Sequence, residues 1–276
     1  MGMRKVWAVC VMVLSISVLS ACDITSQLED SGWVPFSDKK NIKDKPIHYV
    51  SLGDSLTEGV GDEKNQGGYV GRLAKEMQTW DGVKSVTVTN AAKKGRRSDQ
   101  LLAQLESGEL DDTLKNADII TFTIGGNDIM KIVKSHMSSL DKGDFDRELP
   151  SYEKRYEKIF QAIREQNKKV PIIAIGVYNP FTVYTNDVGQ TDIIMKEYND
   201  VMRTIIEQEN HYAIFVPIND LFVSDDDSVY HNDYFHPNAK GYRLMEHRIL
   251  TTLEQQDLYT LSSGNLDMGG NSDDKK

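Results

Sequence analysis

Short apolar segments alternate along most of this chain with longer stretches in which apolar residues recur every three or four positions. The apolar segments predict strands over Ile47–Leu52, Val83–Asn90, Asp118–Ile124, Pro171–Val177 and Tyr212–Pro217. The stretches between them have the period of amphipathic helices. Strands that alternate with helices pair in parallel, and the helices cover both faces of the sheet. We therefore predict an α/β protein built on a five-stranded parallel sheet.

Polar residues that could carry chemistry follow three of these strands. An open parallel sheet binds its ligands at the carboxyl ends of the strands, so these positions are the first candidates. Ser55 follows Gly53 and Asp54 after the first strand, Gly95 lies in the loop after the second, and Asn127 comes just after the third. They offer a hydroxyl, an unobstructed backbone N–H and an amide. Taken singly, each is better explained as a turn or a helix cap.

A fourth candidate segment lies late in the chain, where Asp233 precedes His236 by three residues. Pro237 suits the first position of a helix, which would place His236 at the cap. At this spacing the carboxylate can orient the imidazole and stabilise its cation. Alone, a capping aspartate and a surface histidine would be the simpler interpretation. Together, the four segments supply a nucleophile, a base, its orienting group and oxyanion donors, which is the inventory for acyl transfer.

The four segments resemble, in their order, the sequence blocks of the SGNH hydrolase superfamily, also called GDSL esterases and lipases. The resemblance rests on Gly53-Asp54-Ser55-Leu56-Thr57, Asn90-x-x-x-x-Gly95-x-x-Ser98, Gly125-Gly126-Asn127-Asp128 and Asp233-x-x-His236-Pro237. It implies a flavodoxin-like, three-layer α/β/α sandwich that uses no metal and no cofactor.

The same resemblance implies a role for each site residue. Ser55 would be the nucleophile, His236 the general base, and Asp233 the residue that orients His236. The oxyanion would be held by the backbone N–H groups of Ser55 and Gly95 and by the side-chain amide of Asn127. We therefore expect a serine esterase or lipase that works through an acyl-enzyme.

These residues do not identify the substrate. Acyl lipids or phospholipids are favoured, and an O-acetyl esterase that acts on cell-wall or other polysaccharides is the alternative. A non-catalytic surface lipoprotein that uses the fold as a binding module is a third hypothesis, and the complete set of site residues speaks against it. The segment Met130–Pro150 would either shape a substrate pocket or form a lid.

The N-terminus has the pattern of an export signal. Arg4 and Lys5 precede an apolar run, Val6–Leu19, which is too short for a comfortable membrane span. The run ends in Leu19-Ser20-Ala21-Cys22, which resembles the lipobox of bacterial lipoproteins. This implies that Cys22 is lipidated and begins the mature chain, which would then be held on the extracytoplasmic face of the cell membrane. A plain signal peptide or an uncleaved anchor are the alternatives.

The chain is thus predicted to divide into four parts. These are a signal peptide (residues 1–21), a polar tether (22–46), the hydrolase domain (47–257) and a disordered tail (258–276). The formal net charge of −10 and the pI near 5.1 argue against nucleic-acid binding, which needs a basic surface. We expect a monomer whose partners are an ester substrate and the membrane.

A basic cluster flanks Gly95 in this otherwise acidic chain. It consists of Lys93, Lys94, Arg96 and Arg97. A solvated loop is the simpler interpretation, because most charge runs are solvated. The alternative is that the cluster favours an anionic substrate such as a phospholipid headgroup.

Overall fold

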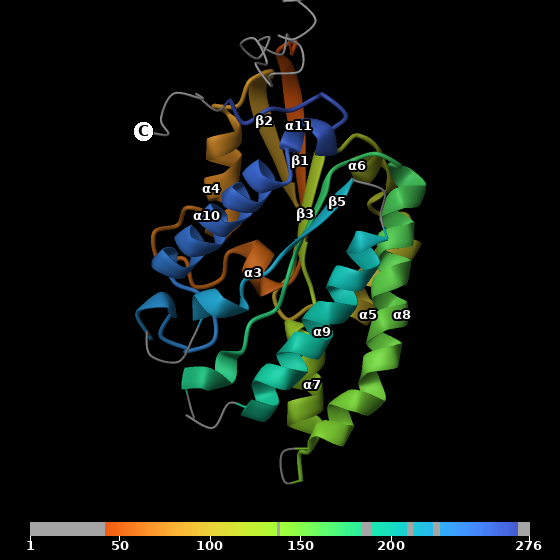
Figure 1. Cartoon of the computed structure of the whole chain (residues 1–276), viewed down its shortest axis with the longest axis vertical. Coiled ribbons are helices and arrows are strands. Elements are labelled where there is room, and N and C mark those ends of the chain that lie inside the picture. The colour runs from red at the N-terminus through yellow and green to blue at the C-terminus, as the bar shows by residue number, and fades with distance from the viewer. Residues whose placement is uncertain (1–41, 137–138, 184–188, 209–211, 223–226, 270–276) are drawn as a thin grey trace, which may run out of the picture. The chain divides into compact units, whose positions relative to one another are not determined.

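The computed structural model describes residues 42–136, 139–183, 189–208, 212–222 and 227–269. Within these residues, five parallel strands form one sheet in the order β2-β1-β3-β4-β5 (Figure 1). The strands are β1 (Lys45–Gly53), β2 (Val83–Asn90), β3 (Ile119–Thr123), β4 (Ile172–Ile175) and β5 (Ala213–Val216). The predicted α/β fold with a five-stranded parallel sheet is confirmed. The predicted signal peptide and residues 22–41 of the tether lie outside the described residues.

Helices connect the strands and cover both faces of the sheet. They are α3 (Ser55–Glu58), α4 (Gly68–Met77), α5 (Ser98–Glu106), α6 (Asp111–Lys115), α7 (Gly126–Ser135), α8 (Lys142–Gln166), α9 (Gly189–Glu207), α10 (Ala239–Gln255) and α11 (Leu258–Leu261), with short 3₁₀ turns η1 (Pro180–Val183), η2 (Asn219–Phe222) and η3 (Asp227–Val229). Residues of α5 to α9 pack with Val50 and Leu52 of β1 in one core. Residues of α4, α10 and α11 pack with Ile47 and Tyr49 in the other. Alternate residues of a strand thus enter opposite layers, as the pleat requires.

The strand order places a crevice between β1 and β3. After β1 the chain moves outward to β2 and then returns past β1 to β3, so the connections diverge at this point. In open α/β sheets such a switch point is where ligands bind, at the carboxyl ends of the strands. Gly53, the last residue of β1, lies in register with Thr123, the last residue of β3. The segments that follow these two residues therefore start side by side.

The folded domain extends past the boundary predicted at residue 257. Leu258 and Leu261 of α11, together with Leu266, are at most 3% exposed and belong to the core on the α4–α10 face. The backbone of Asp81 also pairs with that of Asp267. The prediction of a disordered tail is therefore wrong for residues 258–269, because three leucines spaced along this polar segment are buried. Residues 270–276 lie outside the described residues.

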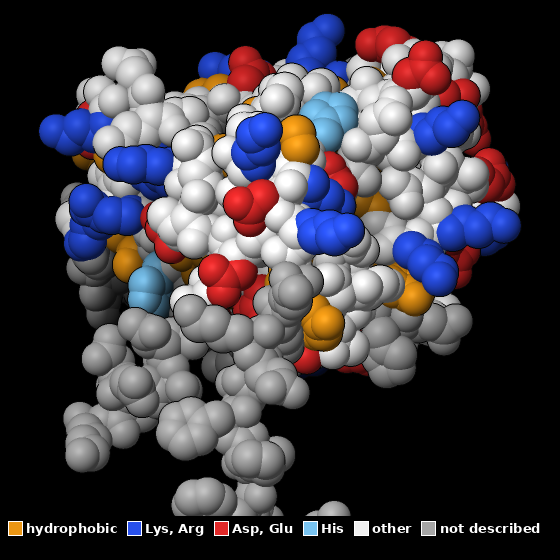
Figure 2. Space-filling model, turned by 90° about the horizontal axis from the view of Figure 1, so that it is seen from above, with side chains coloured by type: hydrophobic (Ala, Val, Ile, Leu, Met, Phe, Trp, Pro, Cys, Tyr) orange, Lys and Arg blue, Asp and Glu red, His pale blue; other side chains and the backbone are white. Residues whose placement is uncertain are grey.

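The surface at the amino ends of the strands is strongly charged. Acidic and basic side chains are interspersed there with few apolar ones in the view from above (Figure 2). Among the described residues, no helix combines the length and the apolar composition needed to cross a membrane.

Candidate active site

A tight turn at the end of β1 presents Ser55. Gly53 has φ = +127°, and a Cβ atom there would lie 2.1 Å from the carbonyl oxygen of Thr123, so only glycine fits between the two strands. The next residue, Asp54, caps α3 by accepting a hydrogen bond from the backbone N–H of Leu56 at 3.1 Å. Ser55 therefore begins the helix at the carboxyl edge of the sheet. Asp54 thus caps the helix that presents Ser55.

Asp54 is the buried end of a chain of hydroxyl groups. The hydroxyl of Thr123 donates to its carboxylate at 2.7 Å, and the hydroxyls of Thr57 and Tyr69 continue the chain at 2.8 and 2.7 Å. Within the described residues, no cation forms an ion pair with Asp54. Burial disfavours the charged form and raises the pKa of Asp54 to about 6. These hydrogen bonds, which no sequence motif indicates, fix the turn that carries Ser55 to β3 and α4.

The structure brings His236 and Asp233 to Ser55. Nε2 of His236 lies 2.9 Å from Oγ of Ser55, although 181 positions separate the two residues in the chain. Nδ1 of His236 lies 2.6 Å from Oδ2 of Asp233. Partial burial raises the pKa of Asp233, but hydrogen bonds from the ring and backbone N–H of His236 outweigh it and lower the pKa to about 2. The carboxylate is therefore ionised and positioned to hold an Nδ1–H tautomer.

A compact loop holds this histidine. Oδ1 of Asp233 accepts hydrogen bonds from the backbone N–H groups of Phe235 and His236. Tyr234, between Asp233 and Phe235, has φ = +51°. The cap of the next helix differs from the prediction. Asn238, not His236, caps α10, because its side-chain oxygen accepts hydrogen bonds from the backbone N–H groups of Lys240 and Gly241. His236 is therefore held by the loop and not by the helix.

The two remaining site residues lie in adjoining segments. Gly95 has φ = +78°, and a Cβ atom there would meet nothing within 4 Å, so its backbone faces open space. Asn127 is the second residue of α7, and its amide donates to the carbonyl oxygen of Arg96 at 3.0 Å. The loop after β2 is also tied to β1, because Lys93 N–H donates to Gly53 O at 3.0 Å. Asn127 and Ser55 line one cavity.

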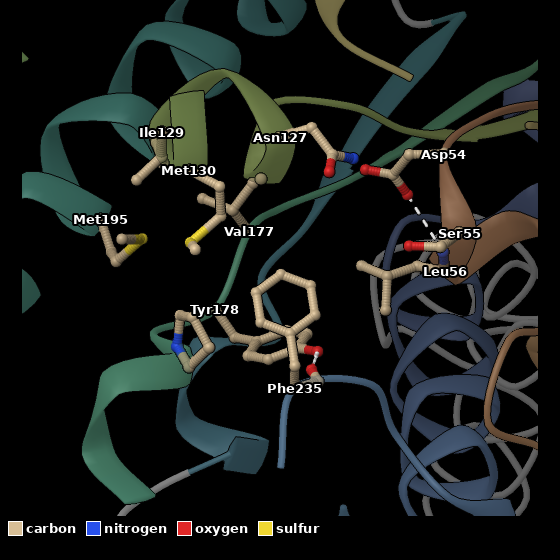
Figure 3. Close-up of a pocket in the computed structure, with 12 residues that line it drawn as sticks. Asp54, Ser55, Leu56, Asn127, Ile129, Met130, Val177, Tyr178, Met195 and Phe235 are labelled. Carbon is tan, nitrogen blue, oxygen red and sulfur yellow. Dashed lines mark hydrogen bonds between the residues drawn. The ribbon is translucent and has the colours of Figure 1, made fainter. Parts of the chain in front are cut away.

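That cavity is largely apolar and opens beside Ser55 (Figure 3). Its interior leaves about 30 Å³ for the centres of water-sized molecules, and its empty volume is about 430 Å³ when all space between the lining atoms and the open mouth are counted. Its walls come from α3, from α7, from the segment after β4, from α9 and from the loop before His236. The lining residues are Asp54, Ser55, Leu56, Gly126, Asn127, Ile129, Met130, Val177, Tyr178, Pro180, Met195 and Phe235. No local sequence pattern indicates this cavity, because its walls come from separate parts of the chain.

Among the described residues of Met130–Pro150, Met130 is the one that lines the cavity. Met130 lies in α7 and lines the cavity, whereas Lys142–Pro150 forms the first turns of α8. Residues 137–138 between them lie outside the described residues. In the described part, this segment shapes the pocket through α7.

A buried polar cluster follows Asn127 in the structure and is not indicated by any local sequence pattern. The carboxylate of Asp128 accepts hydrogen bonds from the backbone N–H and the hydroxyl of Ser98, at 2.9 and 2.6 Å. Nε of Arg155 in α8 donates to the same hydroxyl at 2.7 Å. The cluster ties α5 to α7, the helices that follow the Gly95 loop and Gly125. The motif letters at Ser98 and Asp128 were visible in the sequence, but no local pattern connected Arg155 to them.

The basic cluster divides into two pairs. The buried guanidinium of Arg96 donates to the carbonyl oxygen of Ala91 at 2.6 Å, and Arg97 forms an ion pair with Asp99 at 3.0 Å. Lys93 and Lys94 are exposed and line a cavity that Gly95 also lines. Arg96 and Glu109 line this cavity as well, but the guanidinium of Arg96 is hydrogen-bonded to Ala91, so among the described residues of the cluster Lys93 and Lys94 are the cations that face the cavity without an ion pair.

At the carboxyl edge of the parallel sheet, a carboxylate contacts an imidazole, which in turn contacts a serine hydroxyl. This arrangement is typical of a hydrolase. Residues 51–244 match the GDSL-like lipase/acylhydrolase family. The chain belongs to this family and is a carboxylic ester hydrolase.

Individual relatives agree with this assignment. Uncharacterized protein YpmR of Bacillus subtilis (strain 168) is 36% identical over 250 residues, which cover 90% of this chain and 96% of that protein. The spore germination lipase LipC of Bacillus licheniformis is 26% identical over 212 residues, covering 74% and 94% of the two chains. The crystal structure of the lipase Lip_vut3 from a goat rumen metagenome gives a TM-score of 0.66 at 25% identity, covering 74% and 96%.

Proposed function

We propose that the protein is a serine esterase that hydrolyses acyl lipid or phospholipid esters through Ser55, His236 and Asp233. The observation that carries the proposal is the continuous contact from Asp233 through His236 to the hydroxyl of Ser55, at 2.6 and 2.9 Å. These are hydrogen-bond distances, as a nucleophile, a base and an orienting group need. Buried at one end of an apolar cavity, Ser55 meets a substrate carbonyl away from bulk water.

The mechanism follows from these positions. Nε2 of His236 takes the proton from Ser55 Oγ as the oxygen attacks the ester carbonyl, and the charge on the carbonyl oxygen is stabilised by N–H donors of Ser55, Gly95 and Asn127. His236 then protonates the leaving alcohol, which departs and leaves an acyl group on Ser55. Water, deprotonated by His236, attacks this acyl-enzyme, and the fatty acid is released as the serine regains its proton. Asp233 stabilises the imidazolium in both halves.

The cavity beside Ser55 supports this choice of substrate class. Its walls are mainly aliphatic, sulfur and aromatic groups, which favour an acyl chain over the small acetyl group of a polysaccharide ester. The likeness to the lipases LipC and Lip_vut3 supports the same choice. We further propose that Cys22 carries lipid and holds the enzyme on the extracytoplasmic face of the membrane, as the sequence around it implies. Loss of labelling by a palmitate analogue in Cys22→Ser would support this anchor, and unchanged labelling would refute it.

The test of the activity is hydrolysis of p-nitrophenyl esters, from acetyl to palmitoyl, by the full chain and by Ser55→Ala. We expect activity in the first and none above background in the second. Ser51→Ala is the matched control, because Ser51 is a buried serine of β1 whose hydroxyl has no hydrogen-bond partner among the described residues. Equal loss in both variants would assign the effect to folding, and full activity of Ser55→Ala would refute the proposal.

A further inference from the structure

The cavity beside Ser55 has a polar end and an apolar end. In the close-up, Ser55 and Met195 lie on opposite sides of the cavity, and the side chain of Met130 projects between them (Figure 3). Asp54, Ser55 and Asn127 contribute the polar groups, all on the Ser55 side. A substrate carbonyl at Ser55 would therefore have its chain directed toward α9.

Among the described residues that line the apolar end, no side chain offers a free hydrogen-bonding group to a polar substituent. Tyr178 lines it, but its hydroxyl donates to the carbonyl oxygen of Phe235, so the phenol group is already satisfied. The other walls toward Met195 are the side chains of Ile129, Met130 and Val177. A sugar hydroxyl placed here would lose its hydrogen bonds to water and gain none, which is costly. An alkyl chain loses no hydrogen bond and removes apolar surface from water.

Helix α9 closes the far end through Met195. This side chain is 2% exposed and belongs to the same core as Ile194 and Tyr198. The helix is fixed to α8, where Tyr152 packs on Tyr198 with ring centroids 4.8 Å apart and Lys142 pairs with Glu197 at 2.9 Å. The cavity therefore ends against a packed element and has a limited length. Methionine is flexible, so Met130 and Met195 adapt to a chain that enters but still occupy volume.

We propose that Met195 sets the longest acyl chain that the enzyme accepts, with Met130 forming the adjustable wall beside it. The inference rests on the proposed function, since it concerns the acyl half of the same ester. Met195 and Met130, which would set the specificity for acyl chain length, lie outside the four sequence blocks. Chains that fill the space between Ser55 and Met195 gain apolar contact with each methylene, and longer chains must displace α9 or leave the cavity.

The test is the chain-length profile of kcat/KM on p-nitrophenyl esters, measured on full-length Met195→Ala and Met195→Trp. Met195→Ala lengthens the cavity, and we expect the optimum to move by about two carbons toward longer chains. Met195→Trp shortens it, and we expect kcat/KM for the best substrate of the unmodified enzyme to fall about tenfold or more, with acetyl ester hydrolysis retained. An unchanged profile in both variants, with activity intact, would overturn the inference and leave the proposed function standing.

Met202→Ala is the matched control. Met202 lies two turns further along α9, is fully buried in the same core and does not line the cavity. The Met202→Ala variant loses a buried methionine side chain without changing the cavity, so we expect the optimal acyl chain length to stay the same. A shift equal to that of Met195→Ala would show that general loosening of α9 sets the profile, and would overturn the inference.

A second readout does not depend on turnover. Saturated fatty acids of increasing length can be titrated calorimetrically into Ser55→Ala and into Ser55→Ala/Met195→Trp. We expect affinity to rise with length and to stop rising at a shorter chain in the double variant. Equal length dependence in the two proteins would overturn the inference. If the expected difference is seen but the unmodified protein hydrolyses no ester, only the proposed function is refuted.

Discussion

The side-chain amide of Asn127 donates a hydrogen bond to the main-chain carbonyl of Arg96, 3.0 Å away. Arg96 directly follows Gly95, so this bond joins the start of α7 to the loop after β2. A side-chain amide has two N–H donors, and Arg96 uses one of them. The other is left to donate to a substrate oxygen. The two proposed oxyanion donors outside Ser55 are therefore held in fixed relation before any substrate arrives.

Replacing Asn127 by alanine is expected to lower kcat by about 10²–10³-fold, with a smaller change in KM, because the donor acts on charge that develops in the transition state. Steady-state kinetics on the best p-nitrophenyl ester measure both. Asn116→Ala is the control, since Asn116 is an exposed asparagine whose side-chain amide donates to the carbonyl oxygen of Asp112 in its own helix turn. A rise in KM with kcat unchanged would mean that Asn127 binds substrate without stabilising the transition state.

Asp233→Asn is expected to lower kcat by about 10³–10⁴-fold, because an amide no longer stabilises the imidazolium or selects the tautomer of His236. The nearby His231 provides the control. Its Nδ1 lies 3.8 Å from Oδ1 of Asp233, whereas His236 approaches Oδ2 to 2.6 Å. We therefore expect His231→Gln to keep nearly full activity. Comparable losses in the two variants would show that the site depends on the whole loop and not on the Asp233–His236 pair.

The fold was predictable because buried parallel strands are marked by local apolar runs. The predicted strand Val83–Asn90 has the bounds observed, and Asp118–Ile124 is one residue too long at each end. The ends of strands depend on hydrogen-bond pairing with neighbours, which an apolar run does not encode. The packed segment 258–269 was missed for a similar reason. Leu258 and Leu261 have the three-residue spacing of a helix, but one such pair, with Leu266 five residues further on, is too short a pattern to predict burial, which depends on packing with the rest of the domain.

The candidate site was predictable only where a short motif carries the chemistry. Ser55, Asp233 and His236 were found in this way, and the structure brings them together. No local pattern indicates the hydroxyl groups that are hydrogen-bonded to Asp54, or the end of the cavity at Met195, because both are formed by elements remote in sequence. The basic cluster illustrates the same limit. Composition cannot reveal that two of its four cations already have partners.

Asp54→Asn is expected to stabilise the protein at neutral pH. Burial raises the pKa of Asp54 from 3.8 to about 6, so between these values the folded protein keeps a proton that the unfolded chain has released. The contribution of Asp54 to stability is therefore present at low pH and lost as pH rises to about 6. An asparagine avoids this loss, and its oxygen can still accept the bonds from Thr123 and Leu56. We expect a gain of up to about 3 kcal/mol above pH 6, fading toward pH 4.

Urea unfolding of Asp54→Asn and the unmodified protein from pH 4 to pH 8 measures this difference. Asp220→Asn gives a control of opposite sign, because hydrogen bonds from Arg248 lower the pKa of Asp220. That carboxylate adds stability above its unfolded pKa, and its replacement should destabilise at neutral pH and have less effect in acid. Destabilisation of Asp54→Asn by the same amount at every pH would show that its carboxylate hydrogen bonds outweigh the cost of burying its charge.

Neutralising Lys93 and Lys94 together is expected to weaken hydrolysis of esters whose alcohol carries a phosphate. Both lysines line a cavity shared with Gly95 and Glu109, and in the described part of the chain neither ammonium group forms an ion pair, although the backbone N–H of Lys94 donates to the carboxylate of Glu58. Since exposed charges interact weakly, we expect kcat/KM of Lys93→Gln/Lys94→Gln on a lysophospholipid to fall by up to about tenfold at low salt and by less at high salt. On a neutral monoacylglycerol we expect kcat/KM to stay unchanged. Arg97→Gln, which removes a cation already paired with Asp99, should leave this preference unchanged. An equal response of both substrates to the lysine changes would mean that the two cations are only solvated.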